Sequence, residues 1–216
     1  MPELPDLLYI LKHLRERLLG RPVTAERVRE PVVLRFTVRG NLSLLLGRKL
    51  GDAFRRSHFL VFRFEGLDLA VNPMLAGRFR LSEPGTADEG SLGFALGFGD
   101  VELRYLDDKK MGKAYLIATD DWKAIPGLQT GGIDILSPEF SRERFVSLLK
   151  HRRDQVRVFL LDKKALDSLG NAYADEVLFE AGIHPKTFCR SLTHEDGVRL
   201  HDAIVKGLIP AGSRMP

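Results

Sequence analysis

Hydrophobic residues recur at two different spacings along the chain, and the change of spacing divides the sequence. The first segment has one leucine or isoleucine face repeating every three or four residues, which is typical of an amphipathic helix. Asp6 is a candidate cap for this helix, and Gly20-Arg21-Pro22 is a stop signal. The apolar positions of the predicted helix are Leu7, Ile10, Leu11, Leu14 and Leu18.

Between Val23 and about Leu116 the apolar residues occur in short β-rich runs separated by turn residues. Glu65-Gly66 between two runs indicates a hairpin, and the even spacing predicts an antiparallel sandwich or barrel. The glycine-rich and acidic stretch 82–99 predicts an exposed loop or hairpin end. The predicted strands include residues 32–36, 59–64, 67–71 and 101–105.

The helical spacing returns after Ser137 and continues to the last residues. Four helices are predicted, over residues 140–149, 156–161, 172–181 and 196–208, the last of them opened by a capping-type run that includes Thr193. The proline and glycine content of the segment before Ser137 is typical of a linker. We therefore predict an α+β protein with a β-rich domain at 1–125, a linker at 126–137 and an all-helical domain at 138–216.

Composition narrows the class of protein. Hydrophobic residues make up 44% and charged residues 29% of 216, which excludes disordered and fibrous chains. No apolar run is long enough to span a membrane, and the N-terminus lacks the pattern of a secretory signal. Cys189 is the single cysteine, so no intrachain disulfide forms and a cytoplasmic protein is expected. The net charge of +4 permits a nucleic-acid partner without requiring one.

The start of the chain carries candidate chemistry. Removal of Met1 would leave Pro2 with a free secondary amine, and the pKa of an α-amine lies near ~8, so part of it is neutral and nucleophilic at physiological pH. Such an amine can attack an electrophilic carbon and form an iminium, with the neighbouring Glu3 as general acid or base. The alternative is a start that merely orients the first helix. Pro2 and Glu3 alone favour that alternative.

Five blocks, of which the start of the chain is the first, occur in a specific order. They are PELPD at 2–6, RRSHFL at 55–60, NPMLAGRFR at 72–80, DDKKMG at 107–112 and LGNAYADEVLFEAGIHP at 169–185. In this order the chain resembles the formamidopyrimidine-DNA glycosylase and endonuclease VIII family of base-excision repair enzymes, from Pro2 to about Leu208. The resemblance implies an N-terminal β-sandwich joined to a helix–two-turn–helix DNA-binding domain, which agrees with the division made from hydrophobic spacing.

The resemblance also implies a reaction and a partner. Pro2 would attack C1′ of a damaged nucleotide and expel the base, Glu3 would protonate the opening sugar, and β- or δ-elimination would cut the strand. The partner would be double-stranded DNA with oxidised bases or abasic sites, bound by a monomer that is nucleoid-associated if bacterial. Because the damaged base must leave the stack, side chains must fill the gap.

Several residues match positions that probe or hold DNA in the family. Met74 matches a gap-filling position, Lys109 stands where an arginine faces the orphaned base, and Met111 replaces a phenylalanine. Lysine is a mobile point charge in place of a planar fork, so opposite-base recognition is expected to be looser. Asn171 opens a helix whose backbone N–H groups can clamp a phosphate; a plain N-cap is the alternative, and both can hold together.

Two departures from the family pattern affect these expectations. His58 stands where the family has a catalytic lysine, and the neighbouring Arg55 and Arg56 are candidates for the missing charge or simply a solvated face. The family's C-terminal zinc finger has no counterpart here, so no metal or other cofactor is predicted; a natural minimal form and a truncated chain both remain open. Further basic residues precede Asn171 and either neutralise phosphates or form a solvated helix face: Arg152, Arg153, Arg157, Lys163 and Lys164.

Three functions remain open from sequence. The leading one is a bifunctional glycosylase and abasic-site lyase. The second is a damaged-DNA-binding relative with weakened or lost catalysis, which His58 and the missing finger favour and the intact Pro2-Glu3 pair disfavours. The third is a structural protein whose helical half binds RNA or another protein.

Overall fold

The computed structural model describes residues 2–88, 90–128, 131–167 and 169–208. Its contacts divide the chain into two compact units. One comprises Met1–Pro2 with Asp6–Gln129, and the other comprises Glu3–Pro5 with Thr130–Pro216. The second unit therefore includes three residues from the start of the chain.

Helix α1 (Leu4–Leu18) begins two residues before the predicted cap. Asp6 lies in its first turn, where a carboxylate interacts favourably with the positive end of the helix dipole, and not at the N-cap. The apolar face predicted from the sequence is the buried one, with Leu7, Leu11, Leu14 and Leu18 each at most 6% exposed.

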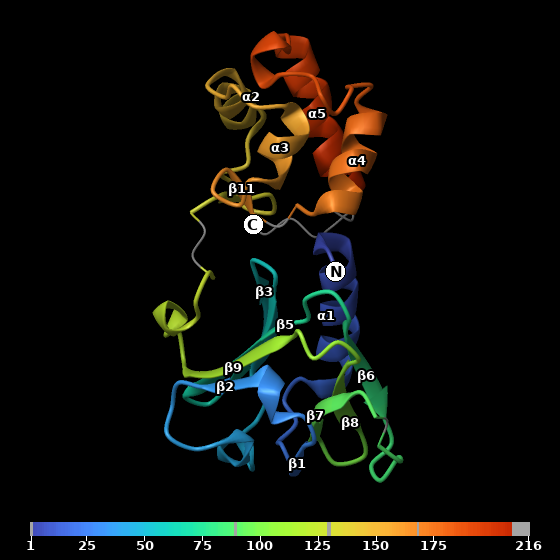
Figure 1. Cartoon of the computed structure of the whole chain (residues 1–216). Helices are drawn as coiled ribbons and strands as arrows, with labels where there is room; N and C mark the ends of the chain where they lie inside the picture. The colour runs from blue at the N-terminus through green and yellow to red at the C-terminus, as the bar shows by residue number, and fades with distance from the viewer. Residues whose placement is uncertain (1, 89, 129–130, 168, 209–216) are drawn as a thin grey trace. The chain divides into compact units, whose positions relative to one another are not determined.

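The first unit contains two sheets with a common core. One sheet has the order β1 (Ala25–Val28), β7 (Leu92–Gly97), β8 (Glu102–Asp107) and β6 (Gly77–Ser82). The other has the order β2 (Leu34–Phe36), β9 (Lys113–Ala118), β5 (Leu67–Asn72), β4 (Phe59–Phe64) and β3 (Asp52–Arg56). Figure 1 shows α1 and strands of both sheets in the first unit. Side chains from both sheets join α1 in one hydrophobic cluster, which confirms the sandwich.

Two expectations for the sheets need correction. The sandwich is not entirely antiparallel, because β2 pairs with β9 in parallel. The stretch 82–99 is not simply an exposed loop: Leu92–Gly97 forms β7, which is buried along its length between β1 and β8. The predicted hairpin at Glu65-Gly66 is confirmed, with Phe64 paired to Leu67 and a positive φ at Gly66.

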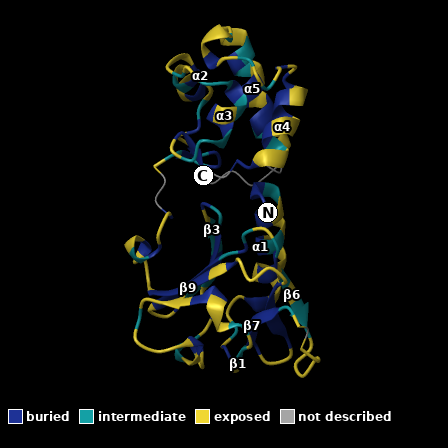
Figure 2. Cartoon of the chain, viewed as in Figure 1, coloured by how far each residue is buried: buried dark blue, intermediate teal, exposed yellow. Residues whose placement is uncertain are grey.

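The second unit is mainly helical, but it is not all-helical as predicted, because it also contains a short pair of strands, one of them in the predicted linker. Its helices are α2 (Arg142–Lys150), α3 (Val156–Leu161), α4 (Asn171–Glu180) and α5 (His194–Leu208), and their inward faces are buried (Figure 2). Thr193 and Asp196 cap α5 reciprocally: the Thr193 N–H donates to Asp196 Oδ2 at 2.8 Å and the Asp196 N–H to Thr193 Oγ1 at 3.1 Å. A short parallel pair, β10 (Ile133–Asp134) and β11 (Leu166–Asp167), joins the start of this unit to the segment before α4.

The described residues also form short 3-10 helices: η1 (Pro31–Val33), η2 (Leu42–Leu45), η3 (Trp122–Ala124) and η4 (Cys189–Ser191). Within the described ranges, we find no helix with both the length and the apolar character needed to cross a lipid bilayer.

Candidate active site

Pro2 borders a hollow of about 550 Å³ in the first unit. Small-molecule sites commonly have volumes of about 300–1,000 Å³, so this one is large enough for a small organic group. The other lining residues come from α1 and from the β5–β6 connection with the start of β6: Asp6, Ile10, Leu75, Ala76, Gly77, Arg78 and Phe79. The structure thus brings the candidate nucleophile beside the loop that carries Met74.

The β5–β6 loop exposes Leu75 more than Met74. Met74 is half-buried in the left-handed region with φ +49°, and its N–H donates to Asn72 Oδ1 at 3.0 Å. Leu75 is 61% exposed and lines the hollow together with Pro2. The sequence analysis did not name Leu75, because it assigned the gap-filling position of the family to the neighbouring Met74 in the same NPML turn, and exposure is not visible in the sequence.

The β8–β9 loop carries the other two candidate probing residues. Lys109 is exposed, and Met111 is 42% exposed. Asp107 holds the base of this loop, because its carboxylate accepts the N–H of Lys109 at 3.1 Å and the N–H of Gly112 at 2.6 Å. Lys110 between them has a positive φ of +52° and pairs with Glu30 at 2.6 Å.

Glu3 binds the first turn of α4. Its two carboxylate oxygens accept the N–H groups of Ala172 at 3.1 Å and Tyr173 at 3.3 Å, and the residue is only 7% exposed. Gly170 is the N-cap residue of α4 and has no side chain to satisfy these donors. A Cβ at Gly170 would lie 2.3 Å from Cδ of Glu3, so glycine leaves the space that the carboxylate fills.

The contact of Glu3 with the first turn of α4 changes the role expected of Asn171. It is the first residue of α4 and not its N-cap, and the N–H groups of Ala172 and Tyr173 are occupied by Glu3 rather than open to a phosphate. The Asn171 side chain is exposed, and its Oδ1 accepts from Arg157 at 3.3 Å.

The basic residues before Asn171 are largely engaged with the protein itself. Arg157 makes a two-pronged ion pair with Asp175, at 2.6 and 3.1 Å, which raises the pKa of its guanidinium. Arg152 bridges Asp154 and Asp162. Lys163 donates to the Leu169 carbonyl at 2.8 Å, and burial lowers the pKa of its ammonium.

His58 and Arg56 lie at the tip of the β3–β4 hairpin. Ser57 and His58 form its two-residue turn, since Arg56 pairs with Phe59, and His58 is half-buried. His58 is not among the described residues that line the hollow at Pro2. Arg56 is exposed, with its guanidinium 4.8 Å from the centre of the Trp122 ring.

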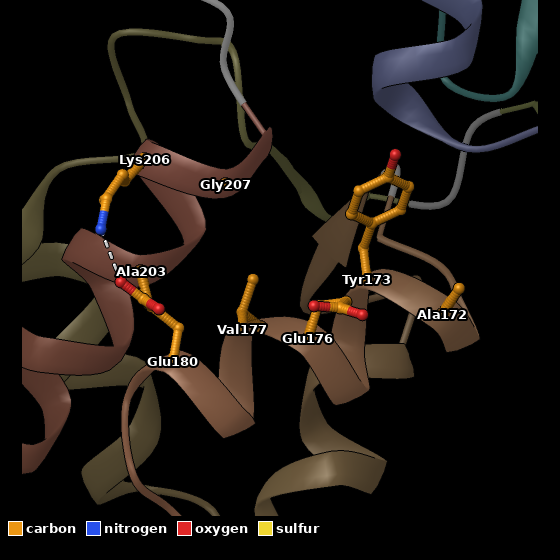
Figure 3. A pocket seen from close by; sticks show the side chains of 8 residues that line it. All are labelled: Ala172, Tyr173, Glu176, Val177, Glu180, Ala203, Lys206 and Gly207. Carbon is orange, nitrogen blue, oxygen red and sulfur yellow. Dashed lines mark hydrogen bonds and ion pairs between the residues drawn. The ribbon is translucent and has the colours of Figure 1, made fainter.

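A second hollow, of about 500 Å³, lies in the helical unit between α4 and α5 (Figure 3). Ala172, Val177, Ala203 and Gly207 supply its small or apolar lining, while Glu180 and Lys206 form an ion pair at its edge. Tyr173 and Glu176 also line it. No group of three or more His, Cys, Asp or Glu residues able to hold a metal occurs among the residues described.

Both parts of the chain match known protein families. Residues 1–114 match the formamidopyrimidine-DNA glycosylase N-terminal domain, and residues 132–211 match the formamidopyrimidine-DNA glycosylase H2TH domain. A formamidopyrimidine-DNA glycosylase of Cytobacillus firmus is 31% identical over 216 residues, covering 96% of this chain and 77% of the relative. That of Thermus thermophilus is 32% identical over 212 residues, covering 98% and 76%.

Solved structures with the same fold contain DNA. The complex of the Lactococcus lactis protein Fpg with abasic-site DNA matches with a TM-score of 0.87 at 26% identity, covering 96% of this chain and 78% of that one. A complex of the wild-type Lactococcus lactis protein with DNA containing an oxidised pyrimidine matches with a TM-score of 0.85 at 27% identity, covering 96% and 78%.

Proposed function

Because the chain belongs to the formamidopyrimidine-DNA glycosylase family, we propose that Pro2 is the nucleophile with which it acts on damaged DNA. The protein is a base-excision repair enzyme, a glycosylase with abasic-site lyase activity, and its partner is DNA that contains damaged bases or abasic sites. The observation that supports Pro2 most directly is its position at the hollow bordered by the exposed Leu75.

The proposed reaction begins with the neutral secondary amine that removal of Met1 creates. The proline nitrogen forms a bond to C1′ of the damaged nucleotide and gives up its proton to the Glu3 carboxylate. The bond from C1′ to the base breaks with its electron pair leaving on the base, which takes a proton from water, and Glu3 then passes its own proton to O4′. Opening of the C1′–O4′ bond then places a proton on O4′ and leaves an iminium at C1′. The iminium acidifies the C2′ proton, so loss of that proton expels the 3′ phosphate, and water releases the proline.

Glu3 is the proposed acid–base partner. Two backbone N–H groups and the space above Gly170 fix its carboxylate in one place. A carboxyl group held in this way can deliver a proton to the opening sugar without a search over rotamers. His58 is proposed as an auxiliary residue near phosphate, in the place of the family's lysine.

Four side chains are proposed to read the DNA around the flipped nucleotide. Leu75, with Met74 beside it, and Met111 would fill the gap in the stack, because exposed apolar side chains can wedge between bases. Lys109 would face the orphaned base. Arg56 and Asn171 would contact phosphates, with Arg157 holding the Asn171 amide.

We also propose that the protein works as a monomer on chromosomal DNA in the cytoplasm, at the nucleoid if the source is bacterial. The chain matches bacterial formamidopyrimidine-DNA glycosylases, which supports a location at the bacterial chromosome.

Borohydride trapping on abasic-site DNA tests the nucleophile. The wild-type protein should form a covalent adduct, which Pro2→Gly weakens and a residue appended before Pro2 abolishes, since the extension ties the nitrogen into a peptide bond. Glu3→Gln should slow base excision by about 10²-fold or more. Intact-mass measurement establishes that Met1 has been removed from the sample.

The same experiment separates the enzyme from its nearest alternative. A binding relative with lost catalysis is favoured by His58 in place of the family's lysine. Tight binding of abasic-site DNA by a correctly processed protein that yields no adduct would establish that alternative and exclude Pro2 as nucleophile.

A further inference from the structure

Tyr105 on β8 lies beneath both loops that carry the proposed probing residues. Its ring is fully buried and packs against Phe79 and Phe94, with ring centres 5.3 Å apart in each case. A Cβ built on Gly77 would lie 2.4 Å from the Tyr105 hydroxyl, and one built on Gly112 would lie 1.7 Å from it. The hydroxyl is therefore in close contact with the backbone at the end of the Leu75 loop and at the end of the Met111 loop.

Asp107 connects this hydroxyl to the second loop. Its carboxylate is 3% exposed and accepts the N–H groups of Lys109 and Gly112. The Tyr105 hydroxyl donates to Asp107 Oδ2 at 3.5 Å. Burial, with a contribution from the charge of Asp107, raises the pKa of Tyr105, so the hydroxyl keeps its proton and remains a donor.

A surface ion pair gives a second, weaker connection between the two loops. Arg78 on β6 pairs with Asp108 in the β8–β9 loop at 2.9 Å, and both side chains are about half exposed. Exposed pairs contribute little, so the buried Tyr105 and Asp107 are the stronger connection.

We propose that Tyr105 and Asp107 are positioning residues that hold the two probing loops at a fixed separation, so that Leu75 and Met111 enter the DNA as one rigid unit. The proposal rests on the proposed function, because it concerns how the probing residues named under that function are held in place. Its physical basis is that a close-packed interior does not deform continuously, so a hydroxyl wedged between two glycine backbones couples them. Apolar wedges that must open a stacked duplex are effective only when their spacing is already set.

The test uses Tyr105→Phe and Asp107→Asn, with Tyr115→Phe as the matched control. Tyr115 is also a buried strand tyrosine, on β9, and packs in the separate cluster with Phe59 and Trp122. Each variant is assayed on duplex DNA with an oxidised base, and on a single-stranded oligonucleotide with an abasic site. The single strand has no stack to open and no partner base, so it requires Pro2 but not the loops.

We expect Tyr105→Phe and Asp107→Asn to slow base excision from duplex by about tenfold or more, while single-strand cleavage stays within about twofold of wild type. Tyr115→Phe should change neither rate. A 2-aminopurine placed opposite the lesion should brighten more slowly in the two variants, because its fluorescence reports unstacking when the loops insert.

Equal loss on both substrates would mean a general structural role, and no loss on either would mean that the loops are positioned independently; both outcomes overturn the proposal. If Asp107→Asn does not fold, as shown by its melting curve, Tyr105→Phe decides alone. Failure of the proposed function is distinct, since the wild-type protein would then leave the single-stranded abasic site uncut and form no borohydride adduct.

Discussion

At the scale of single residues, backbone strain coincides with the proposed site. Within the described part of the chain, the non-glycine residues with positive φ are Ser57, Met74, Lys110 and Asp120. The first three lie in the hairpin of His58, the loop of Leu75 and the loop of Met111. An L-residue in this conformation costs about 1–2 kcal/mol, and such strain gathers where a loop must present a side chain in one direction.

The strain at Ser57 is measurable by comparing two substitutions. Both Ser57→Gly and Ser57→Ala remove the hydroxyl, but only glycine adopts φ +54° without a steric penalty. We expect Ser57→Gly to be more stable than Ser57→Ala by about 0.5–1 kcal/mol in the free energy of unfolding, measured by urea denaturation. Equal stability of the two variants would show that this turn stores no strain.

Cys189 gives a second prediction at this scale. The thiol is 2% exposed, and burial, reinforced by the charge of Asp154, raises its pKa to about 11. At pH 8 the native thiol should therefore react with iodoacetamide much more slowly than the thiol of the urea-unfolded protein, whose pKa returns to about 8.5. Labelling followed by mass spectrometry measures both rates. The native rate should increase as the pH approaches 11 even while the fold persists; rapid labelling at pH 8 without unfolding would contradict the buried position.

At the scale of elements, the start of α4 depends on a residue from the start of the chain. Gly170 offers no capping side chain, and Glu3 supplies the missing acceptor to Ala172 and Tyr173. A helix N-terminus with a carboxylate gains both hydrogen bonds and a favourable dipole interaction. The residue proposed for proton transfer is thus also the cap of the helix that carries Asn171.

Gly170→Ala should remove that arrangement while sparing the backbone, because φ is −117° there and any residue adopts it. The new Cβ would lie 2.3 Å from Oε1 of Glu3 and displace the carboxylate. We expect base excision to fall by about 10²-fold, as for loss of a general acid, with the thermal transition retained.

Gly207→Ala is the matched control for this variant. A Cβ at this exposed α5 position would meet only Val177 Cγ1 at an ordinary 3.8 Å, so activity should be unchanged and the helix slightly stabilised. If Gly170→Ala retained full activity, the observed position of Glu3 would be irrelevant to the chemistry.

Hydrophobic spacing was sufficient to predict α1 and the four later helices, because each buries one face, and the turn residues Glu65-Gly66 were sufficient to predict the hairpin. Strand β7 was missed because its glycines resemble a loop. In the structure Gly93 and Gly97 serve close packing: a Cβ on Gly93 would lie 3.0 Å from the Tyr105 ring, and one on Gly97 3.2 Å from Ala25. Such contacts join residues far apart in sequence, which periodicity cannot register.

In the candidate site, too, sequence motifs predict some features, and contacts between distant residues determine the others. Pro2, Glu3, Lys109 and Met111 follow from motif order, and the structure places Pro2 beside the β5–β6 loop. The prominence of Leu75 over Met74 depends on the left-handed turn at Met74, and Glu3 as the cap of α4 depends on a contact across nearly the whole chain. No local sequence pattern predicts either of these two features.

At the scale of the whole molecule, formal charge is a poor guide to DNA binding. The excess of lysine and arginine gives +4, yet Arg152 and Arg157 are paired with carboxylates. A paired arginine brings a partner of opposite sign to any phosphate it approaches, so it neutralises little net charge. Arg56 instead has its guanidinium over the Trp122 ring, which fixes its place without cancelling its charge.

The salt dependence of binding distinguishes these two kinds of arginine. If Arg56 contacts a phosphate, Arg56→Gln should make the plot of log affinity against log salt shallower by about 0.9. The double variant Arg157→Gln/Asp175→Asn removes a cation and its anion together, so its slope should equal that of the wild-type protein. Fluorescence anisotropy with one duplex, at several salt concentrations and with a residue appended before Pro2 in every protein to prevent cleavage, measures all three slopes. If the double variant loses as much slope as Arg56→Gln, then Arg157 must leave Asp175 on binding DNA, and the ion pair seen here belongs to the free protein alone.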